Sequence, residues 1–278
     1  MKTILFTNAR NEQNIIEWIS HHRRLGFTNI VIFDHKSIHP IYGILQKSGI
    51  NLSNIRVIRI NGDIIKTKLM GKALAIAIKM RCDWMLYLDC DEFLVLNKDT
   101  NIATFAAKYM KYDQVAINWL FFGSNYRENI LDSTESIIQT YTRSQSSLNF
   151  QVKSLLNLRQ ARKYNNIRIP NPHCYVFNNM QNSINVNYKH LNPNEPHFCD
   201  TKEDYRTITA YIAHYVHQSY DEYIKRKIKL PRDDVIGAFR GAMSPSEFHS
   251  LYNEIENTRV SDKYAITTQQ QYNTINNT

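Results

Sequence analysis

Three carboxylates occur within four residues at Asp89, Asp91 and Glu92, directly after the apolar run Trp84–Leu88. Carboxylates this close repel one another unless a cation lies between them. Residues two apart in an extended chain point to the same side, so Asp89 and Asp91 can address one ion together. Hard oxygen ligands suit Mg²⁺ or Mn²⁺, which keep positions open for substrate phosphates. The spacing predicts a metal and diphosphate site, and an acidic surface turn is the alternative.

A second polar group follows the apolar run Ile4–Thr7. It consists of Asn8, Arg10, Asn11 and Glu12. Backbone N–H groups at the start of a helix attract phosphate oxygens, so this segment is a candidate for nucleotide binding. An ordinary helix cap with a favourably placed Glu12 explains the same residues.

Three single residues are further candidates. Asp34 ends the run Asn29–Phe33 and can accept hydrogen bonds from a base or ribose, with a turn or cap as the alternative. Lys72 lies in a helical pattern and joins the expected nucleotide-binding set. His214 carries an imidazole that, when neutral, can complete a metal shell begun by Asp91, although a core or surface histidine is the alternative.

The elements that must position these residues alternate between strand and helix. Apolar runs predict strands over 4–7, 29–33, 55–60, 84–88 and 115–122. Helical periodicity predicts helices over 11–25, 40–47, 66–80 and 102–110. This alternation indicates an α/β fold with a mostly parallel sheet covered by helices on both faces. Ligands bind such sheets at the carboxyl ends of the strands, where Asp34 and Asp89 fall.

The second half is less regular. Strands are expected over 153–158 and 174–177, and a basic amphipathic helix over 219–230. Ser244, Pro245 and Glu247 form a capping-box pattern that predicts a helix to about Glu256. We therefore expect an α/β domain over 1–230, a helical extension over 231–260 and a polar tail over 261–278.

Charge and cysteine content limit the partners. The chain has 34 Lys and Arg against 25 Asp and Glu, a formal net charge of +9, which attracts anions. One dense basic run, Lys225–Lys229, is too short for a nucleic-acid-binding arm, but it is compatible with peripheral contact to a membrane. The four cysteines form no CxxC pair, and no run of 18 apolar residues occurs, so a cytoplasmic protein with free thiols is expected; a Cys174–Cys199 disulfide is the alternative.

Several segments, taken in order, resemble the glycosyltransferase family 2-like and family 92 group. They are Asn11-Glu12, Glu17-Trp18-Ile19, Leu25-Gly26, Trp84–Phe93, Asn118–Ser124, Val152-Lys153-Ser154, Pro172-His173, and His214-Tyr215 followed by Ser219–Lys225. The resemblance covers about residues 1–230. It implies a GT-A fold, a nucleotide-sugar donor, expected to be UDP-linked, and Mn²⁺ or Mg²⁺.

The resemblance also assigns roles. Asp89 and Asp91, which flank Cys90, match the metal and diphosphate motif, and Asp91 is the catalytic aspartate. Asn11, Glu12 and Asp34 match nucleotide-pocket positions, and His214 matches a late metal ligand. Trp119 and Gly123 belong to a segment expected near the donor sugar or the acceptor.

Two departures from the family pattern concern nucleotide contact and the general base. His35-Lys36-Ser37 follows Asp34 where the family more often has Asn before the Ser. No clear Glu-Asp base motif is present, which leaves Glu195, Asp221 and Glu222 as candidates for the carboxylate that inverting transfer needs.

The sequence thus favours a metal-dependent transferase that moves a sugar to a glycan, protein or lipid acceptor. A sugar nucleotidyltransferase is one alternative, but the segment 8–12 lacks the glycines of its phosphate loop. A non-catalytic protein that binds acidic glycans or nucleic acid through its basic surface is the other.

Overall fold

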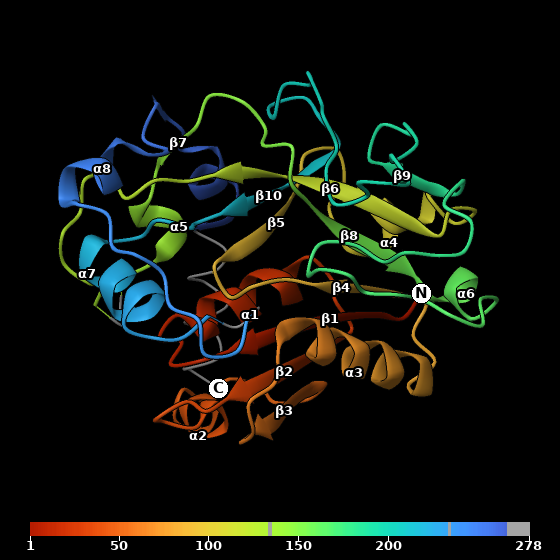
Figure 1. Cartoon of the computed structure of the whole chain (residues 1–278), viewed down its shortest axis with the longest axis horizontal. Coiled ribbons are helices and arrows are strands. Elements are labelled where there is room, and N and C mark those ends of the chain that lie inside the picture. The colour runs from red at the N-terminus through yellow and green to blue at the C-terminus, as the bar shows by residue number, and fades with distance from the viewer. Residues whose placement is uncertain (133–134, 233–234, 266–278) are drawn as a thin grey trace.

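The computed structural model describes residues 1–132, 135–232 and 235–265. A nine-stranded sheet dominates it, with the order β3-β2-β1-β4-β8-β6-β10-β5 and with β9 paired to β6 (Figure 1). A two-stranded sheet joins β7 (Arg143–Ser144) to β11 (Ile255–Glu256). The expected α/β fold with a mostly parallel sheet is confirmed.

The first half forms successive strand–helix units. The strands are β1 (Thr3–Ala9), β2 (Asn29–His35), β3 (Ile55–Ile60) and β4 (Trp84–Tyr87), and the connecting helices are α1 (Ile15–Arg24), α2 (Ile41–Lys47) and α3 (Lys66–Lys79). All four strands run parallel. The apolar runs and helical periodicity predicted each of these elements to within a few residues, apart from the later start of α1.

The second half closes the sheet with mixed strands. They are β5 (Glu92–Leu96), β6 (Gln114–Phe121), β8 (Val152–Asn157), β9 (Ser183–Asn185) and β10 (Ala210–His214). β8 lies antiparallel between β4 and β6, β10 runs parallel to β6, and β5 runs antiparallel to β10. The shorter helices are α4 (Ile102–Ala107), α5 (Ile137–Thr140), α6 (Leu158–Ala161), α7 (Tyr220–Tyr223) and α8 (Pro245–Ser250).

This strand order brings separate parts of the chain to one edge. β1, β4, β6 and β10 share a direction, so their carboxyl ends meet at the same edge of the sheet. β8 and β5 run the opposite way, so their first residues lie at that edge too. Six strands can therefore contribute side chains to a single site.

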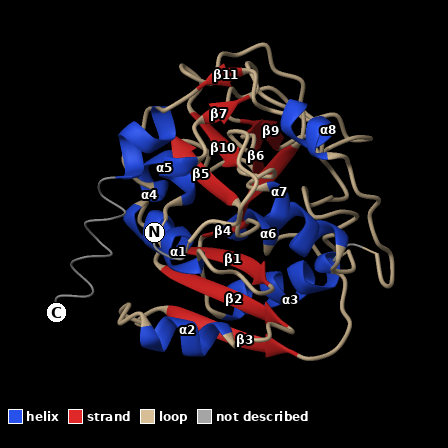
Figure 2. Ribbon diagram, turned by 90° about the vertical axis from the view of Figure 1, so that its left-hand side faces the viewer, coloured by secondary structure: helices blue, strands red, loops and turns tan. Residues whose placement is uncertain are grey.

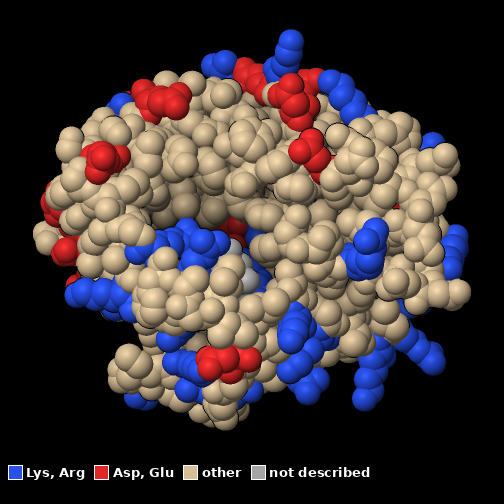
Figure 3. All heavy atoms as spheres, viewed as in Figure 1, with Lys and Arg blue, Asp and Glu red and all other residues tan. Residues whose placement is uncertain are grey.

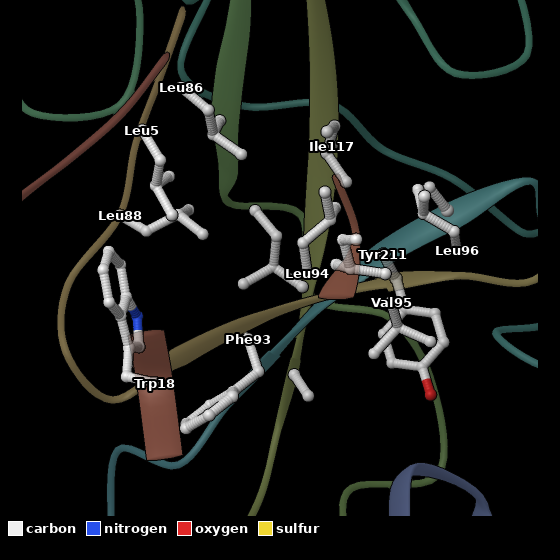
Figure 4. Packing of buried hydrophobic residues seen from close by; sticks show 14 of the residues in the cluster. Leu5, Trp18, Leu86, Leu88, Phe93, Leu94, Val95, Leu96, Ile117 and Tyr211 are labelled. Carbon is white, nitrogen blue, oxygen red and sulfur yellow. The ribbon is translucent and has the colours of Figure 1, made fainter. Parts of the chain in front are cut away.

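Buried apolar side chains fill both faces of the sheet, and Figure 2 shows α1 and α3 on its opposite sides. On one face, strand residues such as Leu5 and Leu86 pack with Trp18 of α1 and with Phe93–Leu96 of β5 (Figure 4). On the other face, Ile4 and other strand residues pack against α3 and α6. β1, β2 and β4 alternate between the two cores, as a sheet covered by helices on both faces requires, whereas the apolar residues of β5 and β10 all belong to the first core.

Several expected elements differ in the structure. The helix expected over 219–230 consists of α7 and a π-helical turn, Ile224–Ile228. The helix that begins after Ser244 ends at Ser250, because the chain turns into β11. Residues 174–177 form no strand and contribute only the single bridge between Val176 and Arg168.

The remaining expectations concern the tail, the thiols and the membrane. Residues 261–265 form a π-helical turn whose Tyr264 is buried against β5, whereas the rest of the expected tail lies outside the described residues. The four cysteines are free, so a Cys174–Cys199 disulfide is not formed. Within the described ranges, no helix is long and apolar enough to cross a bilayer.

Candidate active site at the carboxyl edge of the sheet

The Asp89-Cys90-Asp91 turn lies between β4 and β5, at the edge where the strands end. Glu92 stabilises this turn, because its buried carboxylate accepts a 2.9 Å hydrogen bond from the Asp89 N–H. Cys90 lies 3.2 Å from the Thr7 hydroxyl of β1. The two aspartates line one cavity of about 400 Å³.

Two lysines hold the Asp89 carboxylate. Lys66, at the start of α3, forms an ion pair with one oxygen, and Lys153 of β8 lies 3.3 Å from the other. Lys153 also lies 3.3 Å from Glu92, and its side chain is 1% exposed. Burial alone would raise the pKa of Asp89, but Lys153 and Lys66 outweigh it and hold that pKa well below its usual range. Asp89 is therefore ionised, and each of its two carboxylate oxygens faces a lysine ammonium group.

Asp91 has a different set of neighbours. Lys227 lies 3.4 Å from its Oδ2, and Nε2 of His214 lies 3.6 Å from its Oδ1. Burial opposes ionisation of Asp91, yet Lys227 and His214 lower its pKa. Asp91 is thus a buried carboxylate with one oxygen directed at an imidazole.

His214 is the last residue of β10 and pairs with Glu92 in the β5–β10 register. Its ring packs against Trp119 and Phe121 of β6, with centroids 4.5 and 5.2 Å apart. Burial lowers the pKa of His214 to about 4, so the imidazole is neutral near pH 7 and available as a ligand.

The turn after α7 supplies basic side chains above the aspartates. Arg226 forms an ion pair with Glu12 and lies 3.5 Å from Glu222, while Lys227 reaches Asp91. Burial raises the pKa of Glu12 to about 7, although Arg226 opposes this effect. The pair ties the π-helical turn to the loop after β1.

The cavity is basic overall. Its lining contains seven Lys and Arg side chains against three Asp and Glu. The cations are Arg10, Lys66, Lys153, Arg226, Lys227, Arg232 and Arg240, and the anions are Glu12, Asp89 and Asp91. Figure 3 shows acidic atoms inside a hollow near the centre of this face and basic atoms beside its opening. Such a cavity favours a ligand with several negative charges.

The predicted residues divide into those that line this cavity and those that do not. The lining members are Asn8, Arg10, Glu12, Asp89, Cys90, Asp91, Trp119 and His214. Asn11, Asp34, Lys72, Gly123, Glu195, Asp221 and Glu222 do not line it.

Asn11 and Asp34 connect loops. The Asn11 side chain accepts a 2.8 Å hydrogen bond from the Ile38 N–H. Asp34 accepts hydrogen bonds from the N–H groups of Ser37 and Ile41 and is ion-paired with Arg59 at 2.8 Å. Both side chains therefore hold the segment after β2 in place.

The remaining candidates also lie outside the cavity. Lys72, Glu195 and Asp221 are exposed to solvent. Gly123 packs against Asn253 and the Tyr252 carbonyl, with no room for a side chain. Glu222 contacts Arg226 from beneath the π-helical turn. None of the three expected bases lines the cavity.

Four lysines and arginines that pair with carboxylates of the cavity were not among the expected site residues: Lys66, Lys153, Arg226 and Lys227. Lys66 had a signal in the sequence, because a lysine in the first turn of α3, with no acidic residue beside it, opposes the helix dipole. Lys153 had another, as the one charged residue of β8. Arg226 and Lys227, in the turn after α7, were marked in the sequence only as part of a basic run.

The donor set fits a metal held partly by substrate. Among the residues that the structure describes, no group of three or more His, Cys, Asp and Glu side chains is arranged to hold an ion. Asp91 and His214 supply two donors 3.6 Å apart, and His214 Nδ1 is buried without a hydrogen-bond partner. Mg²⁺ and Mn²⁺ accept few protein ligands when phosphates and waters complete the shell. Asp89 does not fit as a direct ligand, because Lys66 and Lys153 occupy both of its oxygens.

The family model for glycosyltransferase family 92 matches residues 1–272 of this chain. No curated protein matches the chain in a sequence comparison.

Solved structures give only distant similarities. S. aureus TarS, residues 1–349, is 15% identical with a TM-score of 0.37; the match covers 59% of this chain and 49% of that one, so this chain spans about half of its length. HddC from Yersinia pseudotuberculosis is 10% identical with a TM-score of 0.36, over 66% and 91% of the two chains. A putative glucose-1-phosphate thymidylyltransferase from Bacillus anthracis is 11% identical with a TM-score of 0.32, over 49% and 62%. At these values the similarities carry no argument about activity.

Proposed function

Because the chain belongs to glycosyltransferase family 92, we propose that it transfers a sugar from a UDP-linked donor to a hydroxyl of a glycan, protein or lipid acceptor. One observation carries the proposal: Asp89 and Asp91 lie in a cavity whose remaining charged walls are mostly basic. A nucleoside diphosphate sugar presents its negative charge at the diphosphate, and this charge increases when the sugar departs. Preformed cations stabilise such a leaving group without reorganisation at the moment of reaction.

The lysines have a defined part in this proposal. Asp89 holds Lys66 and Lys153, and Asp91 lies beside Lys227, so the aspartates fix three ammonium groups at the cavity wall. These groups bind the diphosphate oxygens and orient the donor, which lowers the entropic cost of reaching the reactive geometry. Asp89 thus positions cations.

We assign Mn²⁺ or Mg²⁺ to Asp91 and His214. The neutral imidazole and the adjacent carboxylate oxygen fit such an ion, with donor phosphates and water at its other positions. When bound, the ion supplies Lewis-acid stabilisation of the departing diphosphate.

Trp119 and His173 give the cavity a polar and aromatic wall for the transferred sugar. The rings lie 5.0 Å apart, and the Trp119 indole N–H is buried without a hydrogen-bond partner in the described structure. His173 Nδ1 lies 3.0 Å from the Val152 carbonyl, which can only accept, so Nδ1 carries the proton and Nε2 is the acceptor. A sugar hydroxyl can donate to Nε2 of His173.

A panel of nucleotide sugars, with Mn²⁺ and with EDTA, tests the proposal. The readouts are thermal stabilisation and released nucleoside diphosphate, first without and then with candidate acceptors. We expect one donor, UDP-linked, to stabilise the protein and to be turned over only with the metal. Asp91→Asn should reduce turnover at least about 100-fold, because it removes a ligand needed in the transition state.

Asp221→Asn is the matched control, because Asp221 is exposed and lies outside the cavity. It should retain turnover close to that of the unmodified protein. Turnover that continues in EDTA would refute the metal assignment, but the proposed sugar transfer would stand. Salt-sensitive binding of polyanions without turnover of any donor would instead place the protein among non-catalytic binding proteins.

A further inference from the structure

Three exposed apolar side chains belong to the loop between α7 and α8, which Figure 1 draws in blue. Val235, Ile236 and Phe239 are 48%, 67% and 61% exposed. Other exposed large apolar residues, such as Ile78 and Phe150, are scattered on separate elements, which is normal for a protein surface. A cluster of three within five residues indicates a contact surface.

The loop is held in place at its base. The Tyr220 hydroxyl donates to the Met243 carbonyl at 2.9 Å, and the Met243 N–H donates to the Tyr223 hydroxyl at 3.0 Å. Within the loop, the Arg232 N–H donates to the Ala238 carbonyl at 2.8 Å. The exposed side chains are therefore carried on an anchored turn, which lowers the entropic cost of binding through it.

Basic residues surround the apolar turn. Residues 225–240 contain six Lys and Arg and two Asp. Lys225 and Lys229 are exposed, while Arg232 and Arg240 line the cavity. We call residues 229–232 and 235–241 the apolar–basic loop. It combines side chains that leave water readily with cations that bind anionic surfaces, on a chain of net charge +9.

We propose that the apolar–basic loop docks the protein on an anionic phospholipid bilayer. Val235, Ile236 and Phe239 enter the boundary between headgroups and acyl chains, and Lys225 and Lys229 bind headgroup phosphates. A turn with three exposed apolar side chains is too small for a stable protein interface, which needs roughly 1,000 Å² or more of buried surface. A bilayer accepts such a turn, because lipids rearrange around it.

Docking in this way has a consequence for the cavity. Leu230 and Pro231 line the cavity together with Arg232 and Arg240, so the apolar–basic loop is continuous with the cavity wall. The bound protein would present its cavity close to the lipid headgroups. The docking itself does not depend on the proposed transferase activity.

Vesicle sedimentation tests the proposal with the whole chain. One set of vesicles contains only phosphatidylcholine, and the other contains phosphatidylcholine with phosphatidylglycerol. We expect binding to the anionic set at low salt and at least tenfold weaker binding to the neutral set. The triple variant Val235→Ser, Ile236→Ser, Phe239→Ser should reduce the partition coefficient at least tenfold while melting at the same temperature as the unmodified protein.

Two control variants, one apolar and one basic, separate docking from general surface effects. Tyr42→Ser, Ile78→Ser, Phe150→Ser removes three exposed apolar side chains from other elements, and it should bind as the unmodified chain does. Lys225→Gln, Lys229→Gln should weaken anionic binding severalfold, whereas Lys72→Gln, Lys79→Gln on α3 should not. Equal binding by the loop variant and the unmodified chain would overturn the proposal, as would no binding to either set of vesicles.

Fluorescence quenching by brominated lipids measures insertion. The native Trp18, Trp84 and Trp119 are at most 5% exposed, so lipid bromines do not reach them. Phe239→Trp should give a blue-shifted emission that brominated anionic vesicles quench. If the emission of the vesicle-bound variant is not quenched, the protein binds the bilayer surface by electrostatic attraction alone, and insertion of the loop is refuted.

Discussion

Nε2 of His214 lies 3.6 Å from Oδ1 of Asp91, although one ends β10 and the other lies in the turn between β4 and β5. The antiparallel pairing of β5 with β10 creates this contact, because it places His214 opposite Glu92. The two side chains meet only because the ends of β4 and β10 and the start of β5 lie at the same edge of the sheet. This contact is the geometric basis of the metal assignment.

Replacing His214 tests that assignment without an activity measurement. His214→Ala removes one of the two proposed protein ligands, so Mn²⁺ affinity in the presence of UDP should fall by about 10- to 100-fold. Titration calorimetry or Mn²⁺ paramagnetic resonance measures the affinity. His190→Ala, at an exposed position, is the control and should leave the affinity unchanged. Unchanged affinity in His214→Ala would remove His214 from the shell.

The two aspartates should differ in their effects on stability. Asp89→Asn removes the charge of the carboxylate that pairs with Lys66 and of one of the two that face Lys153, so we expect a loss of roughly 1–3 kcal/mol in the free energy of unfolding. Asp91→Asn should lose less than about 1 kcal/mol, because Lys227 is 32% exposed and can turn into water. Urea denaturation measures both values. Equal losses would show that Asp89 does not anchor the lysines.

The site was only partly predictable from the sequence, for a physical reason. Asp89 and Asp91 belong to one turn, so local spacing was enough to find them. Lys153 reaches them because β8 runs antiparallel beside β4, and strand order is not encoded by any local pattern. Lys227 likewise depends on where the turn after α7 folds back.

The fold, like the site, was predictable only where a local pattern in the sequence defines the element. β1 to β4 were predicted because each is a separate apolar run between helical patterns, whose sequence alternation gives parallel pairing directly. β5 was missed, since its five residues follow the acidic turn without a break and β10, its partner, comes much later. The expected strand at 174–177 shows the opposite error: those residues are apolar and three of the four are buried, yet they pair only once.

His217 should make stability depend on pH. Its ring is buried and stacks on Phe248 with centroids 4.5 Å apart. Burial lowers its pKa to about 4. The unfolded chain, with a histidine pKa near 6.5, therefore takes up a proton that the folded chain does not. This contribution is complete above pH 6.5 and is lost as the pH falls towards 4, by up to about 1.4 kcal/mol per pH unit.

His217→Phe isolates the effect, because it keeps an aromatic ring against Phe248 and removes the proton site. Between pH 6.5 and 4.5 the variant should lose about 2 kcal/mol less stability than the unmodified protein. Urea denaturation across this range measures the difference, and His39→Gln, at an exposed position, is the control. Parallel curves for His217→Phe and the unmodified protein would show that His217 is not held neutral by the fold.

Two glycines with opposite surroundings test how tightly the segment after β6 is held. A Cβ at Gly123 would lie 2.7 Å from the Tyr252 carbonyl and would overlap the Asn253 side chain, whose oxygen accepts from the Asn125 N–H at 3.0 Å. Gly123→Ala should therefore cost about 1–3 kcal/mol, since a backbone carbonyl must move. Gly43 lies within α2, and its Cβ would meet nothing within 4 Å. Gly43→Ala should stabilise by about 0.4–1 kcal/mol, and a similar change at both positions in urea denaturation would contradict the packing described for Gly123.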